Sequence, residues 1–261
     1  MTEPLMIDGR QHGAPELSNP DLSVLRQALS AGWRDFMAAP LYGILAGLGS
    51  VIAGWALVGI TAAAGHTFWL ILAVFGFPLI APFAALGTYE VSRLLEQGIK
   101  PTLDQVLRVL WAERLRQLPW LCALMVVALL FWFFLGHMIF ALFLGLKPMT
   151  NVTSSLEVFL SPDGLMMLGL GTVVGGLFAF LLYSMCVVGL PMLLDREVDY
   201  VTAMLRSINV VSANPVPMLI WAAVIAMSMF VAMIPGFLGL IVVLPWLGHA
   251  SWHLYRLLMR D

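Results

Sequence analysis

Charged side chains are scarce in this chain of 261 residues. Asp, Glu, Lys and Arg make up 11% of it and hydrophobic residues 61%, whereas soluble domains carry about 25% charged residues. A soluble globular protein or a disordered chain would need far more polar surface than this composition provides. With 13 basic against 15 acidic residues, the chain has no positive excess for binding nucleic acid. The composition therefore indicates a polytopic membrane protein.

Motifs for catalysis are also missing. Two cysteines are too few for a disulfide scaffold, and neither Lys100 nor Lys147, the only lysines, lies in a phosphate-binding glycine-rich loop. His249 and His253 have the i, i+4 spacing of a helical zinc protease, but Ala250 occupies the position of its glutamate base. No G-x-S-x-G sequence occurs and no charged residue lies deep in an apolar stretch, which disfavours a hydrolase and a charge-relay pump. We therefore expect neither an enzyme nor a bound cofactor.

Long uncharged stretches predict the membrane spans. Asp, Glu, Lys and Arg are absent from residues 36–89, 117–146, 164–194 and 207–255. Because a spanning helix needs roughly 20 apolar residues, the first and last stretches each hold two helices. The predicted spans cover about 38–62, 67–90, 119–145, 164–190, 216–234 and 236–257. We therefore predict an all-α membrane protein, with six transmembrane helices in three hairpins forming one domain over residues 19–261.

The basic residues orient these spans. Under this assignment Lys147 lies on one side of the membrane, and the other basic residues all lie on the opposite side. Since basic residues concentrate in cytoplasmic loops, both termini are expected in the cytoplasm. Residues 1–18 are polar and contain no apolar core or cleavage site, so we expect a disordered cytoplasmic tail rather than a signal peptide.

Three segments outside the spans have helical periodicity. Apolar residues recur at i, i+3, i+4 and i+7 within about 20–37, 102–117 and 198–212, which predicts amphipathic helices. In the second segment Thr102 and Gln105 have the spacing of a capping box. Each helix could lie at the headgroup boundary or cap the cytoplasmic end of the bundle. Each precedes one hairpin, a pattern that fits either a threefold parallel repeat or an ordinary six-span protein with cytoplasmic linkers.

Glycines at four-residue spacing mark candidate helix contacts. Gly43 and Gly47 lie in the first predicted span, and Gly171 and Gly175 lie in the fourth. Small residues at this spacing allow two helices to approach closely in a membrane. We therefore predict that these four glycines pack against neighbouring helices.

Several ionisable residues near the span ends are candidate functional groups. Glu90 could pair with Arg93 one turn later, or it could line a cytoplasmic vestibule. His137 lies near the outer surface, where an imidazole either serves a function or reaches water. His249 and His253 share one face of the last span.

A metal site is a further possibility. Cys122, Cys186, His249 and His253 all fall in the cytoplasmic half of the predicted spans. Two thiolates and two imidazoles could bind zinc or copper if these helices met. Alternatively, the cysteines serve as small apolar residues, and His253 belongs to the polar belt at the interface.

Three strings resemble a known family. Residues 76–93 contain GFPLIAPF and LGTYEVSR, residues 213–215 read ANP, and residues 244–256 read LPWLGHASWHLYR. They resemble a bacterial family of predicted integral membrane proteins classed as a domain of unknown function. The resemblance implies a bacterial inner membrane location and no catalytic residue. Members of that family often carry the label cytochrome c oxidase subunit I, which implies haem and copper bound by many intramembrane histidines. This chain has five histidines, and three of them lie in spans at different depths.

Three functions remain open. We favour a non-catalytic accessory or scaffolding protein that contacts the lipid bilayer and either another membrane complex or a second copy of itself. Prolines Pro78, Pro82, Pro191 and Pro245 favour a small-solute transporter or channel instead, because broken helices free backbone groups that line cavities. The third hypothesis is a metal or haem carrier linked to a respiratory oxidase, with His249 among its ligands.

Overall fold

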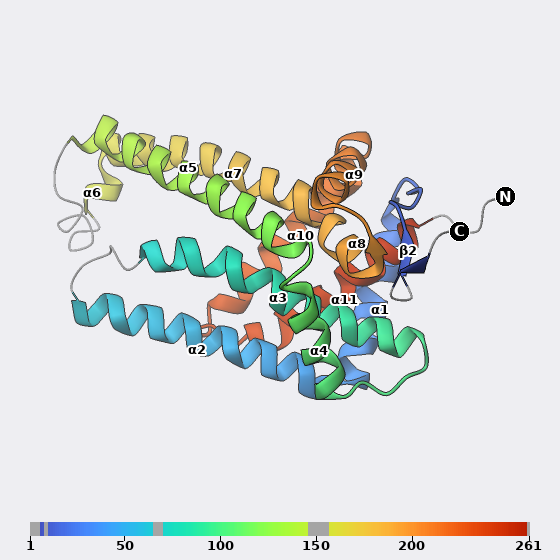
Figure 1. Cartoon of the computed structure of the whole chain (residues 1–261). Helices are drawn as coiled ribbons and strands as arrows, with labels where there is room; N and C mark the ends of the chain where they lie inside the picture. The colour runs from blue at the N-terminus through green and yellow to red at the C-terminus, as the bar shows by residue number, and fades with distance from the viewer. Residues whose placement is uncertain (1–5, 8–9, 65–69, 146–156, 260–261) are drawn as a thin grey trace.

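The computed structural model describes residues 6–7, 10–64, 70–145 and 157–259. Within these ranges the protein is mostly helical, and its long helices run side by side (Figure 1). The helices are α1 (Leu22–Ala38), α2 (Pro40–Ala64), α3 (Leu70–Glu96), α4 (Leu103–Glu113), α5 (Leu118–Leu144), α6 (Glu157–Leu160), α7 (Pro162–Cys186), α8 (Gly189–Asp195), α9 (Tyr200–Ala213), α10 (Pro215–Met233) and α11 (Leu240–Leu258). The strands are β1 (Met6–Ile7), β2 (Arg10–His12) and β3 (Arg196–Glu197).

Within the described residues, 4 helical stretches are long and apolar enough to cross a membrane. They are Pro40–Ile60, Leu118–Leu144, Pro162–Asp195 and Pro215–Met233. The chain is therefore an all-α integral membrane protein. The span predicted at 67–90 begins outside the described residues. The span predicted at 236–257 overlaps α11, which is not among these stretches because histidines and an arginine interrupt its apolar sequence.

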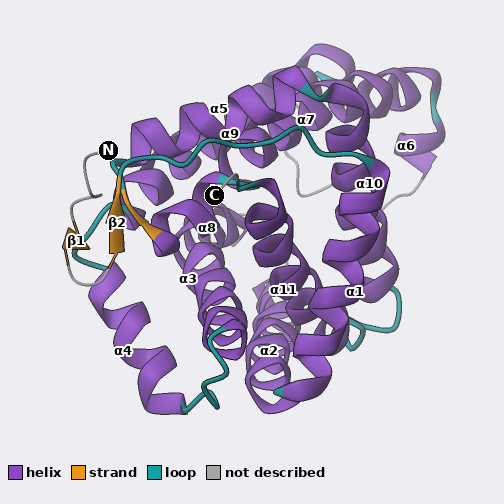
Figure 2. Ribbon diagram, turned by 90° about the vertical axis from the view of Figure 1, so that its right-hand side faces the viewer, coloured by secondary structure: helices purple, strands orange, loops and turns teal. Residues whose placement is uncertain are grey.

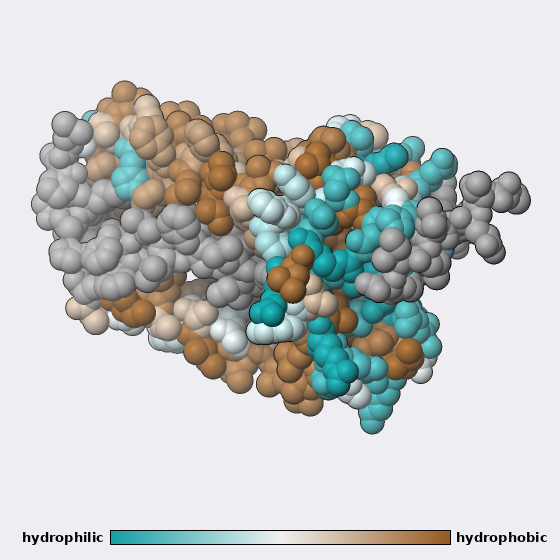
Figure 3. Space-filling model, viewed as in Figure 1, coloured by the Kyte–Doolittle hydropathy of each residue, from teal (hydrophilic) through white to brown (hydrophobic). Residues whose placement is uncertain are grey.

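Polar and apolar residues separate along the length of the molecule (Figure 3). One part, which we call the polar end, contains α1, α4, α8, α9, the strands, the C-terminal part of α3 and the C-terminal part of α11 (Figure 1). The opposite part, which we call the apolar half, contains most of α2, α5 and α7. The described residues nearest the two termini, in β2 and at the end of α11, thus lie at the polar end. This division matches a molecule whose apolar half lies in hydrocarbon and whose polar end reaches water.

Helix α11 lies at the centre of the packing and contacts α1, α2 and α3. Glycines on α1 and α2 make this possible. A Cβ added at Gly32 would collide with the backbone of Ala250, and one added at Gly43 would lie 2.8 Å from Pro245. A Cβ added at Gly47 would lie 2.5 Å from the α11 backbone. Only hydrogen fits at these three positions, so the glycines set the distance between α11 and the α1–α2 pair.

The two glycines predicted to pack on the fourth span behave differently from each other. At Gly175 an added Cβ would lie 3.0 Å from the ring of Trp132 on α5. At Gly171 an added Cβ would meet nothing within 4 Å. Within the described chain, the prediction of a helix contact at Gly171 is therefore wrong, because this residue faces outward from the α5–α7 pair.

The N-terminal segment is held by residues far away in the sequence. Residues 1–5 and 8–9 lie outside the described residues, but the expectation of disorder is wrong for residues 10–18. Strand β2 pairs in parallel with β3, with His12 opposite Glu197. The backbone N–H of Ser18 donates to the carbonyl of Leu258 at the end of α11. The polar composition of the segment predicted disorder, whereas a free strand edge and a helix end supply its hydrogen bonds.

The helix predicted over 164–190 is interrupted. Helix α7 ends at Cys186, and α8 begins at Gly189 and continues to Asp195. Pro191 has no backbone N–H to continue the helical ladder. At the break, the backbone N–H of Val188 donates to the Ser207 hydroxyl on α9 at 3.1 Å. A polar side chain from another helix thus compensates for the break.

Helices α1, α4 and α9 surround the polar end (Figure 2). They overlap the three segments where periodicity predicts amphipathic helices. Each has a side-chain cap at its start: Asp21 accepts from Val24 N–H, Thr102 and Gln105 form a capping box, and Asp199 accepts from Thr202 N–H. The hydrogen bond from the Val24 backbone holds the pKa of Asp21 below its usual value, and Thr202 does the same for the pKa of Asp199.

Candidate functional site

The polar end contains a chain of hydrogen-bonded side chains that links α1, α3, α8 and α11. On α3 the side chains of Thr88, Glu90 and Ser92 are buried, with at most 2% exposed. His249 on α11 is fully buried as well. Burying a polar group is costly unless it finds a partner. The partners of these residues therefore determine what the site can do.

Ser92 and His249 form the innermost contact. The Ser92 hydroxyl lies 2.8 Å from Nδ1 of His249, and neither residue is exposed. The other ring nitrogen of His249, Nε2, is buried and has no hydrogen-bond partner among the described residues. Because the hydroxyl is closed off from solvent, this pair joins α3 to α11 and presents no nucleophile to a substrate.

His253, one turn further along α11, lies between two carboxylates. Its Nε2 is 2.7 Å from Oδ2 of Asp35 on α1, and its Nδ1 is 3.4 Å from Oε1 of Glu96 on α3. An imidazole donates from both nitrogens only when it is protonated. Asp35, His253 and Glu96 thus connect three helices, and a charged imidazole satisfies both carboxylates.

The two carboxylates respond differently to this environment. Burial raises the pKa of Asp35, but hydrogen bonds from His253 and Ser92 outweigh it, and the pKa lies below its ordinary value. Burial also raises the pKa of Glu96, and the positive charges of Arg256 and His253 oppose this only partly, so that pKa lies above its ordinary value. The ionised form is therefore favoured more strongly at Asp35.

The chain continues from Glu96 to α8. Arg256 Nε lies 3.2 Å from Glu96 Oε2, and Arg256 Nη1 lies 3.8 Å from Asp195 Oδ2. The buried Tyr255 hydroxyl donates to the same Asp195 oxygen at 2.9 Å. Asp195 is thereby shared by two residues of α11.

Glu90 forms a bidentate pair with Arg93. The Arg93 Nε and Nη2 atoms lie 2.7 Å and 2.9 Å from the two Glu90 oxygens. Glu90 is 1% exposed. The geometry therefore agrees with the ion pair rather than with an open vestibule, because both carboxylate oxygens are occupied.

Glu113 is a second buried carboxylate, and sequence reasoning missed it. It is 1% exposed and accepts from Arg10 at 2.8 Å and from Arg116 at 3.2 Å. A signal was present in the sequence, since Glu113 follows Val106 and Leu110 at helical spacing on the apolar face of α4. The pair with Arg10 also ties the N-terminal segment to α4.

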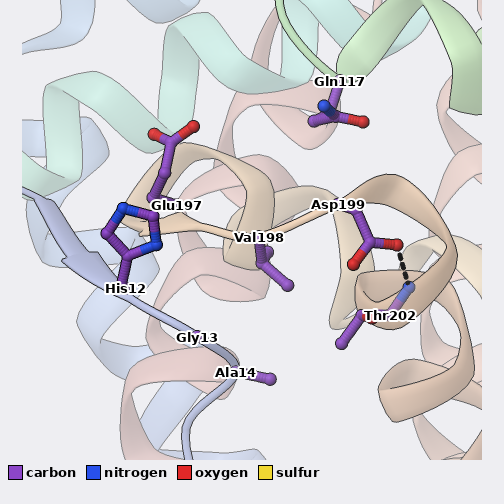
Figure 4. Close-up of a pocket in the computed structure, with 8 residues that line it drawn as sticks. All are labelled: His12, Gly13, Ala14, Gln117, Glu197, Val198, Asp199 and Thr202. Atoms are coloured by element: carbon purple, nitrogen blue, oxygen red, sulfur yellow. Dashed lines mark hydrogen bonds between the residues drawn. The ribbon is translucent and has the colours of Figure 1, made fainter. Parts of the chain in front are cut away.

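A shallow hollow of about 430 Å³ opens between the N-terminal segment and the start of α9 (Figure 4). His12, Gln117, Glu197, Asp199 and Thr202 are among its lining residues. Asp199 is already engaged as the cap of α9, and Glu197 forms an ion pair with Arg116. These two carboxylates are therefore engaged in stabilising the polar end.

The four residues proposed as metal ligands are not brought together. Cys122 lies in the apolar core, and the Cys186 thiol lies 3.7 Å from the sulfur of Met125. His249 and His253 are bound to Ser92 and Asp35. Among the described residues, no group of three or more His, Cys, Asp or Glu side chains could hold a metal ion.

His137 lies apart from these residues. Its Nδ1 is 2.8 Å from the carbonyl of Phe133 one turn earlier, and the two rings are in contact with centroids 4.2 Å apart. The backbone of its own helix α5 therefore satisfies this histidine.

A comparison with known proteins identifies part of the chain. Residues 70–195 match the family model described as Predicted integral membrane protein (DUF2189). We call residues 70–195 the DUF2189 region because they match that model. The resemblance expected from the sequence is thereby confirmed over this segment. The DUF2189 region runs from α3 to α8 and includes Glu90, Ser92, Arg93, Glu96 and Asp195. No curated protein and no solved structure matches the chain.

The residues that complete the hydrogen-bonded chain come from outside the DUF2189 region. Asp35 precedes it, and His249, His253, Tyr255 and Arg256 follow it in α11. The region therefore supplies the α3 and α8 sides of the network. The N-terminal and C-terminal helices supply its partners.

Proposed function

We propose that this protein is a non-catalytic accessory protein that scaffolds a membrane complex through the sides of its apolar helices. The sparse packing of these helices carries the proposal. Only 17% of an apolar window of α2, 22% of one in α5 and 17% of one in α10 is buried within the chain. In the stretch that covers α7 and α8 the corresponding share is 56%.

Large side chains lie on the uncovered surfaces. Phe131 and Phe134 on α5 are 62% and 63% exposed, and Phe230 on α10 is 65% exposed. In a bilayer, either lipid or another protein covers such residues. Membrane helices associate by close packing, so rigid aromatic rings and the outward-facing Gly171 suit a protein partner.

The state of the polar groups supports the same proposal. In the part of the chain that the structure describes, the buried carboxylates Glu90 and Glu113 are each paired with arginines, and His253 is held by Asp35 and Glu96. Groups engaged with one another stabilise helix positions and offer little to a substrate. They suit a rigid membrane anchor.

We further infer six spans in three hairpins, with both termini in the cytoplasm of a bacterium and the helices in its inner membrane. The packing of α2 on α3, α5 on α7 and α10 on α11 supports this arrangement. So does the location of β2 and of the C-terminal end of α11 at the polar end (Figure 1). The topology is tested by fusing a reporter active only in the cytoplasm to either terminus. An inactive fusion at either terminus contradicts it.

Photo-crosslinking in native membranes tests the scaffold function. A photoreactive phenylalanine analogue replaces Phe134 or Phe230, and a matched control replaces the fully buried Trp221 on α10. We expect discrete adducts with another membrane protein from the two exposed positions and none from the buried one. Adducts with a second copy alone would indicate self-association. Adducts with lipid alone from both positions would contradict the proposal.

A small-solute transporter is the second candidate, and the helix interruptions favour it. The helical structure is interrupted between α7 and α8, and Pro245 lies inside α11 beside the polar network. Interrupted helices often line solute sites in transporters. Purified protein in liposomes should then move a small solute, and the absence of flux for every solute class tested would count against it. The carrier hypothesis has no comparable support, because His249 and His253 are bound to other side chains.

A further inference from the structure

Helix α4 has a second apolar surface that no part of the described chain covers. Its inner face carries Val106 and Leu110, which pack against α3 and its neighbours. The adjoining outer face carries apolar residues one turn apart, and their exposed fractions rise along the helix. They are Leu103 at 52%, Leu107 at 54% and Trp111 at 65%; Leu115, in the turn that follows the helix, is 80% exposed.

The position of α4 places this outer face at the membrane boundary. In Figure 1 the helix runs across the long axes of α2, α3 and α5 rather than along them. In Figure 3 the same region lies where the brown apolar surface meets the teal polar surface. An amphipathic helix that lies in the plane of the interface buries its apolar side among lipid headgroups and upper acyl chains.

Basic side chains border the apolar surface. The guanidinium carbon of Arg114 lies 3.3 Å from the ring centroid of Trp111. A hollow of about 710 Å³ beside them is lined by Leu107, Arg108, Trp111, Arg114 and a few neighbours. Arginine binds phosphate oxygens with two parallel N–H groups, and tryptophan favours the headgroup level of a bilayer.

One acidic residue, Asp104, also lines the hollow and pairs with Arg108 at 2.8 Å. Both side chains are exposed, at 78% for Arg108 and 67% for Asp104. An exposed pair of this kind contributes little, so a lipid phosphate can displace Asp104 from Arg108. Arg114 is held by the Trp111 ring on the same face, and Lys100 precedes the helix in an exposed position.

We propose that the outer face of α4 docks into the bilayer surface, and that Arg108 and Arg114 bind the phosphate of an anionic phospholipid beside Trp111. Lipid is the expected ligand because the adjoining apolar half places a bilayer directly beside the helix. The excess of basic over acidic groups in the hollow selects an anionic headgroup. This site is independent of the scaffold function.

Spin labelling tests the docking. The full-length protein carries a nitroxide at Leu107→Cys or, as a control outside the hollow, at Gln27→Cys on the exposed side of α1, with Cys122 and Cys186 changed to Ala in both. In liposomes of phosphatidylcholine and phosphatidylglycerol, we expect the label at 107 to collide with oxygen and to be shielded from a water-soluble nickel complex. The label at 27 shows the opposite pattern.

Two outcomes of that experiment overturn the docking. Equal nickel accessibility at 107 and 27 means that α4 lies in water. A label at 107 that is shielded from both reagents means that another protein or a second copy covers the face.

Native mass spectrometry tests the phosphate site. Wild-type protein should retain phosphatidylglycerol in preference to phosphatidylcholine, and R108Q and R114Q should each weaken that retention about fivefold, the usual effect of one basic residue near a membrane. R26Q, which removes an exposed arginine from α1, serves as the control and should leave retention unchanged. Equal losses in all three variants indicate a general charge effect and overturn the site. Displacement of the lipid by excess inorganic phosphate overturns the lipid as occupant.

Discussion

Helix α5 is buried at one end, whereas large side chains along its middle are exposed. At the polar end Leu118, Leu121 and Cys122 are at most 1% exposed. Further along, Phe131 and Phe134 are more than 60% exposed. The same contrast holds for the whole molecule. The polar end joins its helices through ion pairs, shared histidines and glycine contacts, whereas apolar windows of α2, α5 and α10 are only about a fifth buried.

This difference has a physical origin. Inside a bilayer an apolar side chain gains little by leaving lipid for another helix, so hydrophobic burial alone does not hold the helices together. At the polar end, water restores the hydrophobic effect, and buried polar groups demand specific partners. We therefore expect the polar end to determine the stability of the fold and the apolar half to determine what the protein contacts in the membrane.

The largest effect is expected from breaking a buried ion pair at the polar end. Arg93→Met leaves Glu90 buried without its bidentate partner, which should lower the free energy of unfolding by about 3–5 kcal/mol. Denaturant unfolding in mixed micelles at neutral pH measures this loss of unfolding free energy. Arg108→Met, which removes an exposed pair on α4, is the control and should cost less than about 1 kcal/mol. Similar losses of unfolding free energy in the two variants would show that the buried pair stabilises the fold no more than the exposed one.

Closing a glycine contact at the polar end should have the next largest effect. Gly32→Ala puts a methyl group into the backbone of Ala250, and overpacking of this kind costs about 1–3 kcal/mol. Gly49 has open space around an added Cβ, so Gly49→Ala should stabilise its helix by about 0.5–1 kcal/mol. The thermal unfolding temperatures of the two variants should move in opposite directions. Equal shifts would show that α1 and α11 can separate without cost.

The link between α1 and His253 should give a moderate and pH-dependent effect. Asp35→Asn removes a carboxylate that accepts from His253 at 2.7 Å, which should cost about 1–3 kcal/mol at pH 7. Because the folded pKa of Asp35 lies below its ordinary value, its stabilisation is present above that ordinary value and is lost as the pH falls through the folded pKa.

The raised pKa of Glu96 acts in the opposite sense. Its contribution is present below its ordinary pKa and is lost as the pH rises through the folded value. The difference in unfolding free energy between wild type and Asp35→Asn should therefore shrink between pH 7 and pH 3. A difference that grows toward acid pH would exclude this role for Asp35.

The smallest effect on stability is expected in the apolar half. Phe134→Ala truncates an exposed ring and should change the unfolding free energy in detergent by less than about 0.5 kcal/mol. Leu121→Ala, at the buried end of the same helix, should cost about 2–5 kcal/mol. Fluorescence-monitored unfolding of the two variants compares the ends of α5 directly. A large loss from Phe134→Ala would show that this surface packs within the chain.

Patterns that depend on near neighbours were readable from the sequence. Thr102 and Gln105 predicted the capping box that starts α4, and Glu90 lies three residues before the Arg93 that binds it. Both follow from the geometry of one helical turn. Gly43 and Gly47 have the spacing of a helix contact, and α11 is the partner that they meet.

Contacts between distant segments were not readable in this way. His253 and Asp35 are separated by 218 positions in the sequence, and no local spacing indicates that α11 lies against α1. The same applies to Arg10 and Glu113, whose pairing orders a segment that composition alone assigns to disorder. Gly171 shows the converse, because its spacing matches a packing motif while the fold turns it outward.

By itself, the sequence determined that this is an integral membrane protein built of apolar helices. With 61% hydrophobic and 11% charged residues, the chain has too few charged side chains to cover the surface of a soluble protein. It also determined the amphipathic segments, through periodicity that extends over a few turns. The tertiary structure alone decided which helices meet, where α7 is interrupted and which side chains from distant segments pair. Those outcomes depend on the free energy of burying specific groups against residues far away in the chain, and no local pattern records that quantity.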